Sequence, residues 1–143
     1  MGKNKNNQAI WNTRIKKDTS TLFQKIGNSI DVDKKLYKED IVGSIAHVEM
    51  LCSQKIISFK VKNKIVYGLN IIEKEIFKNK FEYNKKYEDI HISIEKRLFQ
   101  IIGEDAGYMH TARSRNDQVI TDFKMWIRSA TIEINKNLDD IIK

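Results

Sequence analysis

Residues 114–143 read SRNDQVITDFKMWIRSATIEINKNLDDIIK, and this stretch decides the fold class. Its apolar residues recur at nearly heptad spacing, which predicts one amphipathic helix about 40 Å long. The rest of the chain does not supply helices long enough to cover it. The pattern therefore predicts the start of a larger helical bundle, and a small domain with a protruding helix is the alternative. The stripe consists of Ile120, Phe123, Ile127, Ile134, Leu138 and Ile141.

Three shorter segments upstream also repeat apolar residues at helical spacing. The first runs from about Asp33, which we interpret as its N-cap, to about Ser53. The second covers about 58–80, and the third covers about 88–102 with Gly103 as its stop signal. No strand-like alternation appears, so the predicted fold class is mainly α. The predicted core residues are Leu36, Ile41, Ile45, Val48 and Cys52, then Ile65, Leu69, Ile72 and Ile76, then Ile90, Ile94, Leu98 and Ile101.

The other segments are predicted to be irregular. Residues 1–30 carry no clean period and are interpreted as an arm, whereas 103–113 contain two glycines and predict a turn or loop. The predicted organisation is thus an arm (1–30), a helical domain (31–113) and the first part of a bundle (114–143). The arm is expected to contact the core through Trp11, Leu22, Phe23 and Ile26.

Composition excludes several classes of protein. The chain has 143 residues, of which 31% are charged and 41% hydrophobic, as in an ordinary globular domain. The net charge is +7, but the lysines are interleaved with acidic residues, so nucleic-acid binding is not predicted. No apolar run reaches the about 18 residues of a membrane span, and the polar N-terminus does not resemble a signal peptide. A single cysteine, Cys52, excludes an internal disulfide and predicts a cytoplasmic protein.

The densest polar cluster is His110-Thr-Ala-Arg-Ser-Arg-Asn-Asp-Gln118, at the start of the long predicted helix. A helix N-terminus offers free backbone N–H groups and a partial positive charge. Together with Ser114, Arg115 and Asn116, it would form a cradle for a carboxylate or a phosphate. The alternative is a solvated helix cap made by Ser114 or Asn116. That alternative does not require two arginines and a histidine.

Two smaller clusters are less decisive. Asp89 and His91 lie on either side of the core residue Ile90, so the carboxylate could orient the histidine, or Asp89 could be a cap and His91 a surface residue. Residues 43–47, Gly-Ser-Ile-Ala-His, predict a close contact between helices. The three histidines lack the spacing of metal ligands and there is no second cysteine, so no metal site is predicted.

Residues 111–118, Thr-Ala-Arg-Ser-Arg-Asn-Asp-Gln, resemble the first signature of the argininosuccinate lyases in the fumarase/aspartase superfamily. Three further blocks match in order and spacing, so the resemblance covers about 8–143. One departure is Trp11-Asn-Thr-Arg-Ile15, where the family usually has Trp-Gly-Gly-Arg-Phe. The matching blocks are Ser29–Asp33 with Leu36, Tyr37, Asp40 and Ile41; Gly43 and Ser44 with Ala46, His47, Met50 and Leu51; and Glu88–His91 with Ile94, Glu95 and Leu98.

The resemblance implies the N-terminal helical domain of the fumarase/aspartase-type fold, followed by the first long helix of its central bundle. It implies reversible β-elimination of argininosuccinate to arginine and fumarate, by a cytoplasmic homotetramer without metal or organic cofactor. It assigns substrate binding to Ser29, Ser114, Arg115 and Asn116, and a supporting role to Asp89 and His91.

The same resemblance places the general base and general acid beyond Lys143. No catalytic residue is therefore expected in this chain, and the isolated chain is expected to be inactive. The alternative is a non-catalytic helical remnant or scaffold of the same family. The dense polar cluster at 110–118 argues against a remnant, because a drifting sequence loses such a cluster readily.

Overall fold

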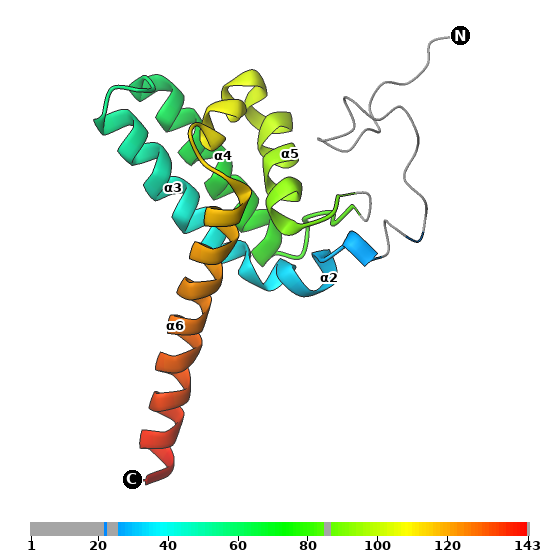
Figure 1. Cartoon of the computed structure of the whole chain (residues 1–143), viewed down its shortest axis with the longest axis vertical. Coiled ribbons are helices and arrows are strands. Elements are labelled where there is room, and N and C mark those ends of the chain that lie inside the picture. The colour runs from blue at the N-terminus through cyan, green and yellow to red at the C-terminus, as the bar shows by residue number, and fades with distance from the viewer. Residues whose placement is uncertain (1–21, 23–25, 85–86, 143) are drawn as a thin grey trace.

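The computed structural model describes residues 22, 26–84 and 87–142, and every regular element within these ranges is helical. This confirms the predicted mainly α class. Helices α3, α4 and α5 pack side by side, and α6 extends away from them (Figure 1). In chain order the elements are α2 (Ile30–Asp33), the 3-10 helix η1 (Lys34–Leu36), α3 (Tyr37–Ser53), α4 (Phe59–Phe77), α5 (Ile90–Ile102), the 3-10 helix η2 (Gly103–His110) and α6 (Arg115–Ile142).

The core lies between α3, α4 and α5, and the predicted apolar stripes face it. The α4 stripe is buried along its whole length, and α5 contributes three fully buried residues from its own stripe. Ser58 caps α4 by accepting a hydrogen bond from the backbone N–H of Val61 (3.2 Å). Gly103 ends α5 with a φ of 72°, which a glycine adopts without strain. The buried stripe residues are Ile41 and Val48, then Ile65, Leu69, Ile72 and Ile76, then Ile90, Ile94 and Leu98.

Three predictions about segment ends and loops were wrong. Asp33 does not cap α3, because the chain passes through η1 first and α3 begins after Leu36. The segment predicted as a loop after Gly103 contains the 3-10 helix η2. Leu22 and Ile26 are exposed, so they do not anchor an arm to the core, and Trp11 and Phe23 lie outside the described residues.

Among the residues that the structure describes, α6 packs against the helical domain through its first turns and then extends away from it (Figure 1). Its two buried residues are polar, Gln118 and Asp122, and they lie four positions apart on one face. The predicted apolar stripe of α6 is exposed instead, which fits the prediction that this helix needs long partners outside the domain. In the described part of the chain, no helix is both long and apolar enough to cross a membrane. The exposed stripe comprises Ile120, Phe123, Ile127, Ile134, Leu138 and Ile141.

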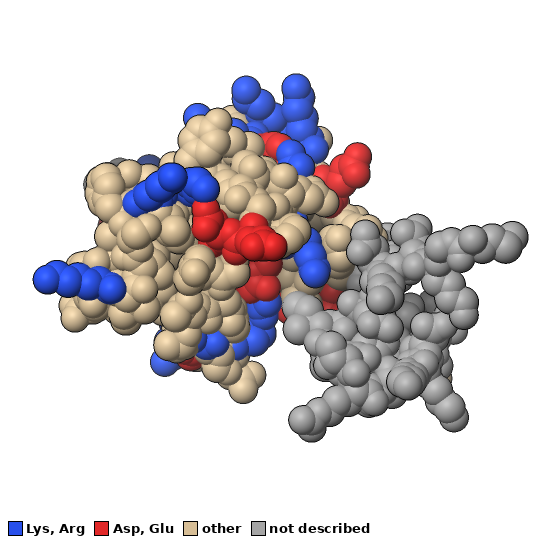
Figure 2. Space-filling model, turned by 90° about the horizontal axis from the view of Figure 1, so that it is seen from above, with Lys and Arg blue, Asp and Glu red and all other residues tan. Residues whose placement is uncertain are grey.

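Charged side chains are mixed over the surface. On the face seen in Figure 2, lysine and arginine side chains are spread around the molecule with acidic side chains between them. This distribution follows from the interleaved sequence. It differs from the single basic patch typical of a nucleic-acid-binding protein.

Candidate functional site

The N-terminus of α6 presents the residues predicted to hold an anion. Ser114 accepts a hydrogen bond from the backbone N–H of Asn116 (3.3 Å), so it caps the helix as the alternative interpretation proposed. The side chains of Ser114 and Asn116 are both exposed. Just before them, Ala112 has a φ of 56°, a left-handed conformation that non-glycine residues rarely adopt. The chain therefore makes a tight turn just before α6 begins, and the N-terminus of α6 stays accessible to a ligand.

Arg115 is held in place by two neighbours. Its Nη2 donates to Oε1 of Glu95 on α5 (2.9 Å), and its Nη1 donates to Oε1 of Gln118 one turn further along α6 (2.6 Å). The Arg115 and Glu95 side chains are about a quarter exposed. A guanidinium has five N–H donors, so this arrangement fixes the group and leaves N–H groups for a ligand. Arginine held in this way suits bidentate recognition of a carboxylate or a phosphate.

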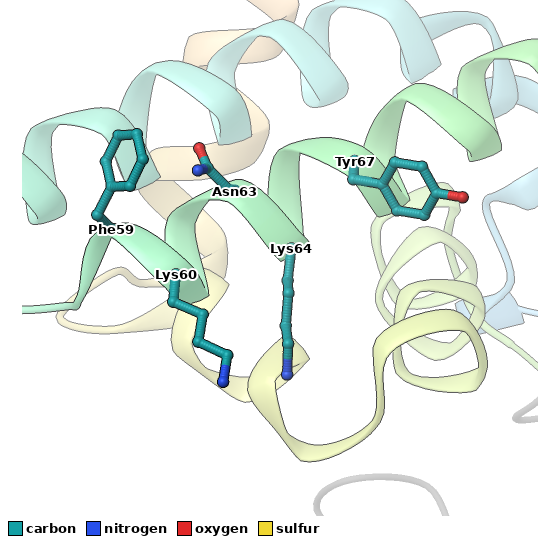
Figure 3. Close-up of a pocket in the computed structure, with 5 residues that line it drawn as sticks. All are labelled: Phe59, Lys60, Asn63, Lys64 and Tyr67. Carbon is teal, nitrogen blue, oxygen red and sulfur yellow. The ribbon is translucent and has the colours of Figure 1, made fainter.

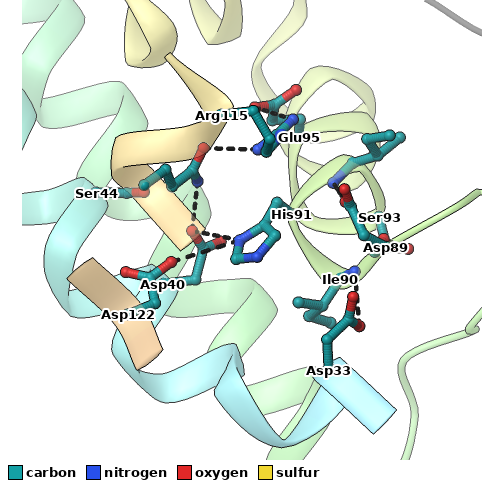
Figure 4. Close-up of polar contacts among 12 residues, drawn as sticks. Asp33, Asp40, Ser44, Asp89, Ile90, His91, Ser93, Glu95, Arg115 and Asp122 are labelled. Atoms are coloured by element: carbon teal, nitrogen blue, oxygen red, sulfur yellow. Dashed lines mark hydrogen bonds and ion pairs between the residues drawn. The ribbon is translucent and has the colours of Figure 1, made fainter. Parts of the chain in front are cut away.

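Behind Arg115 lies a buried polar cluster, shown in Figure 4. The amide nitrogen of Gln118 donates to Oδ1 of Asp40 on α3. The same Asp40 oxygen lies 3.0 Å from Nδ1 of His91 on α5, and Oδ2 of Asp122 lies 3.5 Å from that nitrogen. All four side chains are buried, and neither oxygen of Asp122 is in hydrogen-bond geometry with a described donor. The cluster therefore joins α3, α5 and α6 through titratable groups removed from water.

Burial and mutual charge shift the titration of these groups. Burial, followed by the charge of Asp40, raises the pKa of Asp122 to about 7. Burial alone would raise the pKa of Asp40, but its contacts with His91 and Gln118 bring that pKa below the usual value. Burial alone would lower the pKa of His91, but the Asp40 carboxylate raises it above the usual value. Near neutral pH, Asp122 therefore binds a proton that an exposed aspartate would release.

This cluster is also the place where a cation could bind. One ligand atom each from Asp40, His91 and Asp122 lies within 4.8 Å of the others. Carboxylates and imidazole are ligands of several divalent metals. A proton on Asp122 offsets the same buried charge without an ion. The sequence analysis predicted no metal site from the spacing of the histidines and from the resemblance. It did not include Asp40 and Asp122 among the possible metal ligands.

The start of α5 holds two further predicted site residues. Asp89 caps the helix, because its Oδ1 accepts from the backbone N–H of Ile92 (2.6 Å). Asp33 accepts from the backbone N–H of Ile90 (3.1 Å) and from the hydroxyl of Ser29 (2.5 Å). Burial raises the pKa of Asp33, although the Ser29 contact opposes the shift. Ser29 is thereby fixed beside the N-terminus of α5, and it makes no described contact with the cluster at the start of α6.

The segment 43–47 brings α6 close to α3, as its small residues predicted. A Cβ on Gly43 would lie 3.2 Å from Oδ1 of Asp122, so any side chain here would press on the buried carboxylate. Arg113 donates to the hydroxyl of Ser44 (3.2 Å), and Nε2 of His47 lies 3.0 Å from the carbonyl oxygen of Thr111. These contacts fix the turn that precedes α6 against α3.

The sequence analysis identified the segments 43–47, 88–91 and 110–118, which lie close together in the structure. It did not identify the side chains that contact their polar residues. His91 is buried, so the surface interpretation of this residue was wrong, whereas the capping role of Asp89 is confirmed. Glu95, Asp40 and Asp122 were assigned no role. A signal for Asp122 did exist, because it lies one helical turn after Gln118 and on the same face.

A shallow surface hollow lies elsewhere, on the outer side of α4 (Figure 3). Lys64 there pairs with Asp105 (2.5 Å), and the hollow is mostly apolar. None of the predicted site residues lines it, so it is separate from the polar cluster. Its lining residues are Phe59, Lys60, Asn63, Lys64 and Tyr67.

Comparison with known proteins identifies relatives over almost the whole chain. A model of the lyase family matches residues 13–143. The argininosuccinate lyase of Pelagibacter ubique (strain HTCC1062) is 82% identical over 143 residues, which are 100% of this chain and 31% of that protein. The argininosuccinate lyases of Bartonella bacilliformis and Ehrlichia canis are each 46% identical, over 94% and 92% of this chain and 29% and 28% of their own lengths. The chain spans about a third of the length of these relatives.

Proposed function

Since the chain belongs to the lyase family, as its four sequence blocks predicted, we propose that it is the N-terminal portion of an argininosuccinate lyase. The proposed reaction is the reversible β-elimination of argininosuccinate to arginine and fumarate, a step of arginine biosynthesis. The named relatives support the reaction, and their greater length supports the view that the remaining catalytic groups lie on a longer protein.

One observation in this chain supports the proposal most directly. Arg115 is fixed by Glu95 and Gln118 at the open N-terminus of α6, with the exposed polar side chains of Ser114 and Asn116 beside it. Such an arrangement of donors, held before the substrate arrives, is what a carboxylate with growing negative charge requires.

In the proposed mechanism, a base removes a proton from the carbon next to a substrate carboxylate. The electrons move onto that carboxylate as an aci-carboxylate, and an acid protonates the guanidino nitrogen as the C–N bond breaks. Ser114, Arg115 and Asn116 stabilise the charge on the carboxylate. The base and acid come from the rest of the longer protein. Ser29, which precedes α2 and lies beside the N-terminus of α5, contributes a further substrate contact, and Asp89 and His91 support the local structure there.

We further propose that the complete enzyme is a cytoplasmic homotetramer in which the apolar stripe of α6 is covered by partner helices. The exposed stripe supports this assignment, because a long helix with one apolar face gains stability by burying it. A non-catalytic scaffold of the same family is the second candidate. The same exposed stripe favours it, since helix assembly alone would also cover that face.

The test is a fusion enzyme. Residues 1–143 replace the matching segment of the Pelagibacter ubique argininosuccinate lyase, and fumarate release from argininosuccinate is measured against the unmodified relative. We expect turnover within about tenfold of that relative. Asn116→Ala should lower kcat/KM by roughly 100-fold, as removal of one donor to a developing negative charge does. Asn70→Ala, at an exposed position on α4, is the matched control and should have no effect.

The two candidate functions predict different outcomes. A folded fusion that is inactive, beside a fully active relative, would contradict the enzymatic proposal and favour the scaffold. A fusion whose turnover survives Asn116→Ala would instead show that the cradle at the start of α6 does not bind the reacting carboxylate.

A further inference from the structure

A continuous line of polar contacts runs from the surface cradle into the core of the domain. It begins at Arg115, passes to Gln118 through the amide oxygen, and continues from the amide nitrogen to Asp40. From Asp40 it reaches His91, whose Nδ1 lies 3.0 Å from Oδ1. The contacts cross from α6 to α3 and from α3 to α5, so they connect helices that are distant in sequence (Figure 4).

We propose that Gln118 and Asp40 are positioning residues that lock the guanidinium of Arg115 and the imidazole of His91 into one unit, through two hydrogen bonds and the Asp40–His91 ion pair. This inference rests on the proposed function, because it takes Arg115 as the group that binds the substrate carboxylate. It goes further by assigning a role to two buried residues that lie behind the open end of α6 and that the proposed function does not use.

The chemistry of the link depends on an amide at residue 118. The amide oxygen accepts from a cation while the amide nitrogen donates to an anion, and no other side chain of this length does both. The Gln118 side chain is almost completely buried and Asp40 is fully buried, so water cannot replace either contact. A glutamate at residue 118 would keep the contact with Arg115 but would lose its donor and face Asp40 with a second negative charge.

The link matters because Arg115 lies at the start of α6, a helix that buries few of its side chains against the described part of the domain. Gln118 and Asp122 are the two fully buried residues among those described on α6, so they set how the first turns of α6 sit against α3 and α5. A displacement of about 1 Å in a group that orients a substrate can cost roughly 100-fold in rate. Breaking the link should therefore lower catalysis even though every substrate-contacting residue is retained.

The first experiment places Gln118→Glu in the active fusion enzyme and measures kcat and KM per folded tetramer. We expect kcat to fall about tenfold or more, with a smaller change in KM. Gln54→Glu, at an exposed position directly after the C-terminus of α3, is the matched control and should change neither constant. A residue with only a structural role would reduce the yield of folded enzyme and leave kcat of the folded fraction unchanged, which would overturn the proposal.

A second variant tests the contact itself. Both contacts of Asp40 converge on Oδ1, so in the double variant Gln118→Glu/Asp40→Asn an asparagine nitrogen at that position can donate one N–H to the glutamate and the other to Nδ1 of neutral His91. The number of buried negative charges stays the same, and each contact of residue 40 still joins a donor to an acceptor. We expect the double variant to recover at least threefold in kcat over Gln118→Glu alone, a coupling typical of residues in contact. If the fold-change in kcat of the double variant equals the product of the fold-changes of the two single variants, a direct link between residues 118 and 40 is contradicted.

A readout independent of activity separates this inference from the proposed function. In the 143-residue chain, the ring nitrogens of His91 are followed by ¹⁵N NMR, with His91→Gln used to assign the signal. Gln118→Glu should shift the His91 titration by at least half a pH unit, whereas Gln54→Glu should not move it. An unchanged titration would overturn the positioning role. A shifted titration in a chain whose fusion has no turnover would uphold the link between residues 118, 40 and 91 and reject the lyase activity alone.

Discussion

The Oδ2 atom of Asp122 lies 3.5 Å from Nδ1 of His91, and solvent reaches neither side chain. Burial disfavours the negative charge of a carboxylate in this position. The charge can be balanced by a protonated imidazole, or it can be removed when the carboxyl group binds a proton. Its pKa of about 7 indicates that the proton is retained over much of the acidic range. The stability of the domain should therefore depend on pH through this contact.

The sign of that dependence follows from the three buried groups. The pKa of Asp122 is raised from 3.8 to about 7, so its contribution to stability is full below pH 3.8 and is lost as the pH rises towards 7. The raised pKa of His91 means that its contribution is full below pH 6.5 and is lost at higher pH. The lowered pKa of Asp40 acts only in strong acid, where stability falls as that group is protonated.

We predict that the free energy of unfolding of the 143-residue chain decreases from pH 5 to pH 8. The slope due to Asp122 is at most about 1.4 kcal/mol per pH unit. Asp122→Asn should match the parent near pH 5 and be more stable than the parent at pH 8, because the amide cannot ionise. The residual slope comes from His91, which also faces Asp40 and is influenced by Asp89 and Arg115. Urea unfolding at four pH values measures both slopes.

Asp139→Asn, at an exposed position on the same helix, is the control and should leave the slope unchanged. Parallel curves for the parent and Asp122→Asn would contradict the prediction. The measurements are repeated with EDTA. A loss of stability on chelation would indicate that a cation, not a proton, offsets the charge of the cluster.

A second prediction concerns the contact between α4 and α5. Gly68 faces Leu98 so closely that an added Cβ would clash with Cδ1 of that leucine, and it would lie 3.3 Å from Cγ2 of Ile102. Leu98 is fully buried and has little room to move. Gly68→Ala should therefore destabilise the domain by about 1–3 kcal/mol, despite the better helix propensity of alanine. Gly107→Ala, which meets no atom within 4 Å, should change stability little. Equal midpoints for the two variants in urea would contradict this account.

The helices and their core faces were predictable because apolar spacing depends on a period that the chain carries locally. Ile65, Leu69, Ile72 and Ile76 repeat at helical steps, and burial of this stripe follows directly. The end of α5 at Gly103 was predictable for a similar reason, since a left-handed residue there needs a glycine. The entry into α3 was not, because the side chain of Asp33 binds the distant backbone of Ile90 instead of its own helix.

The buried polar cluster could not be predicted from the sequence, for a different reason. An aspartate in a helix is normally solvated, and nothing near Asp40 in the sequence distinguishes it from a surface residue. Their burial depends on the crossing of α3 and α6, which Gly43 permits by its lack of a side chain. The spacing of Gln118 and Asp122 indicated a polar face but not what that face would meet. The residues of the cradle, by contrast, were visible because they are adjacent in sequence.

A third prediction concerns Asp33, which ties Ser29 to the start of α5. Asp33→Ala removes the acceptor for both the backbone N–H of Ile90 and the Ser29 hydroxyl. The free energy of unfolding should fall by about 1 kcal/mol, the usual effect of losing such a cap. Hydrogen exchange of the Ile90 amide should become faster. Asp31→Ala, an exposed residue on the same short helix, should alter neither quantity. Unchanged exchange at Ile90 would show that Asp89 alone is sufficient to cap α5.

The last prediction concerns the apolar face of α6. Ile134 and Leu138 are more than half exposed, and the rings of Phe123 and Trp126 stack with centroids 6.3 Å apart on the same helix. A contiguous apolar surface of this kind drives association. In sedimentation velocity, the 143-residue chain should therefore sediment faster as its concentration rises from about 5 to about 200 μM. Ile134→Lys/Leu138→Lys should abolish this change, whereas Asn135→Lys, which adds a charge beside the stripe, should preserve it. A parent chain that stays monomeric throughout would mean that this face does not associate with itself, and the proposed tetramer would need its contacts from other helices.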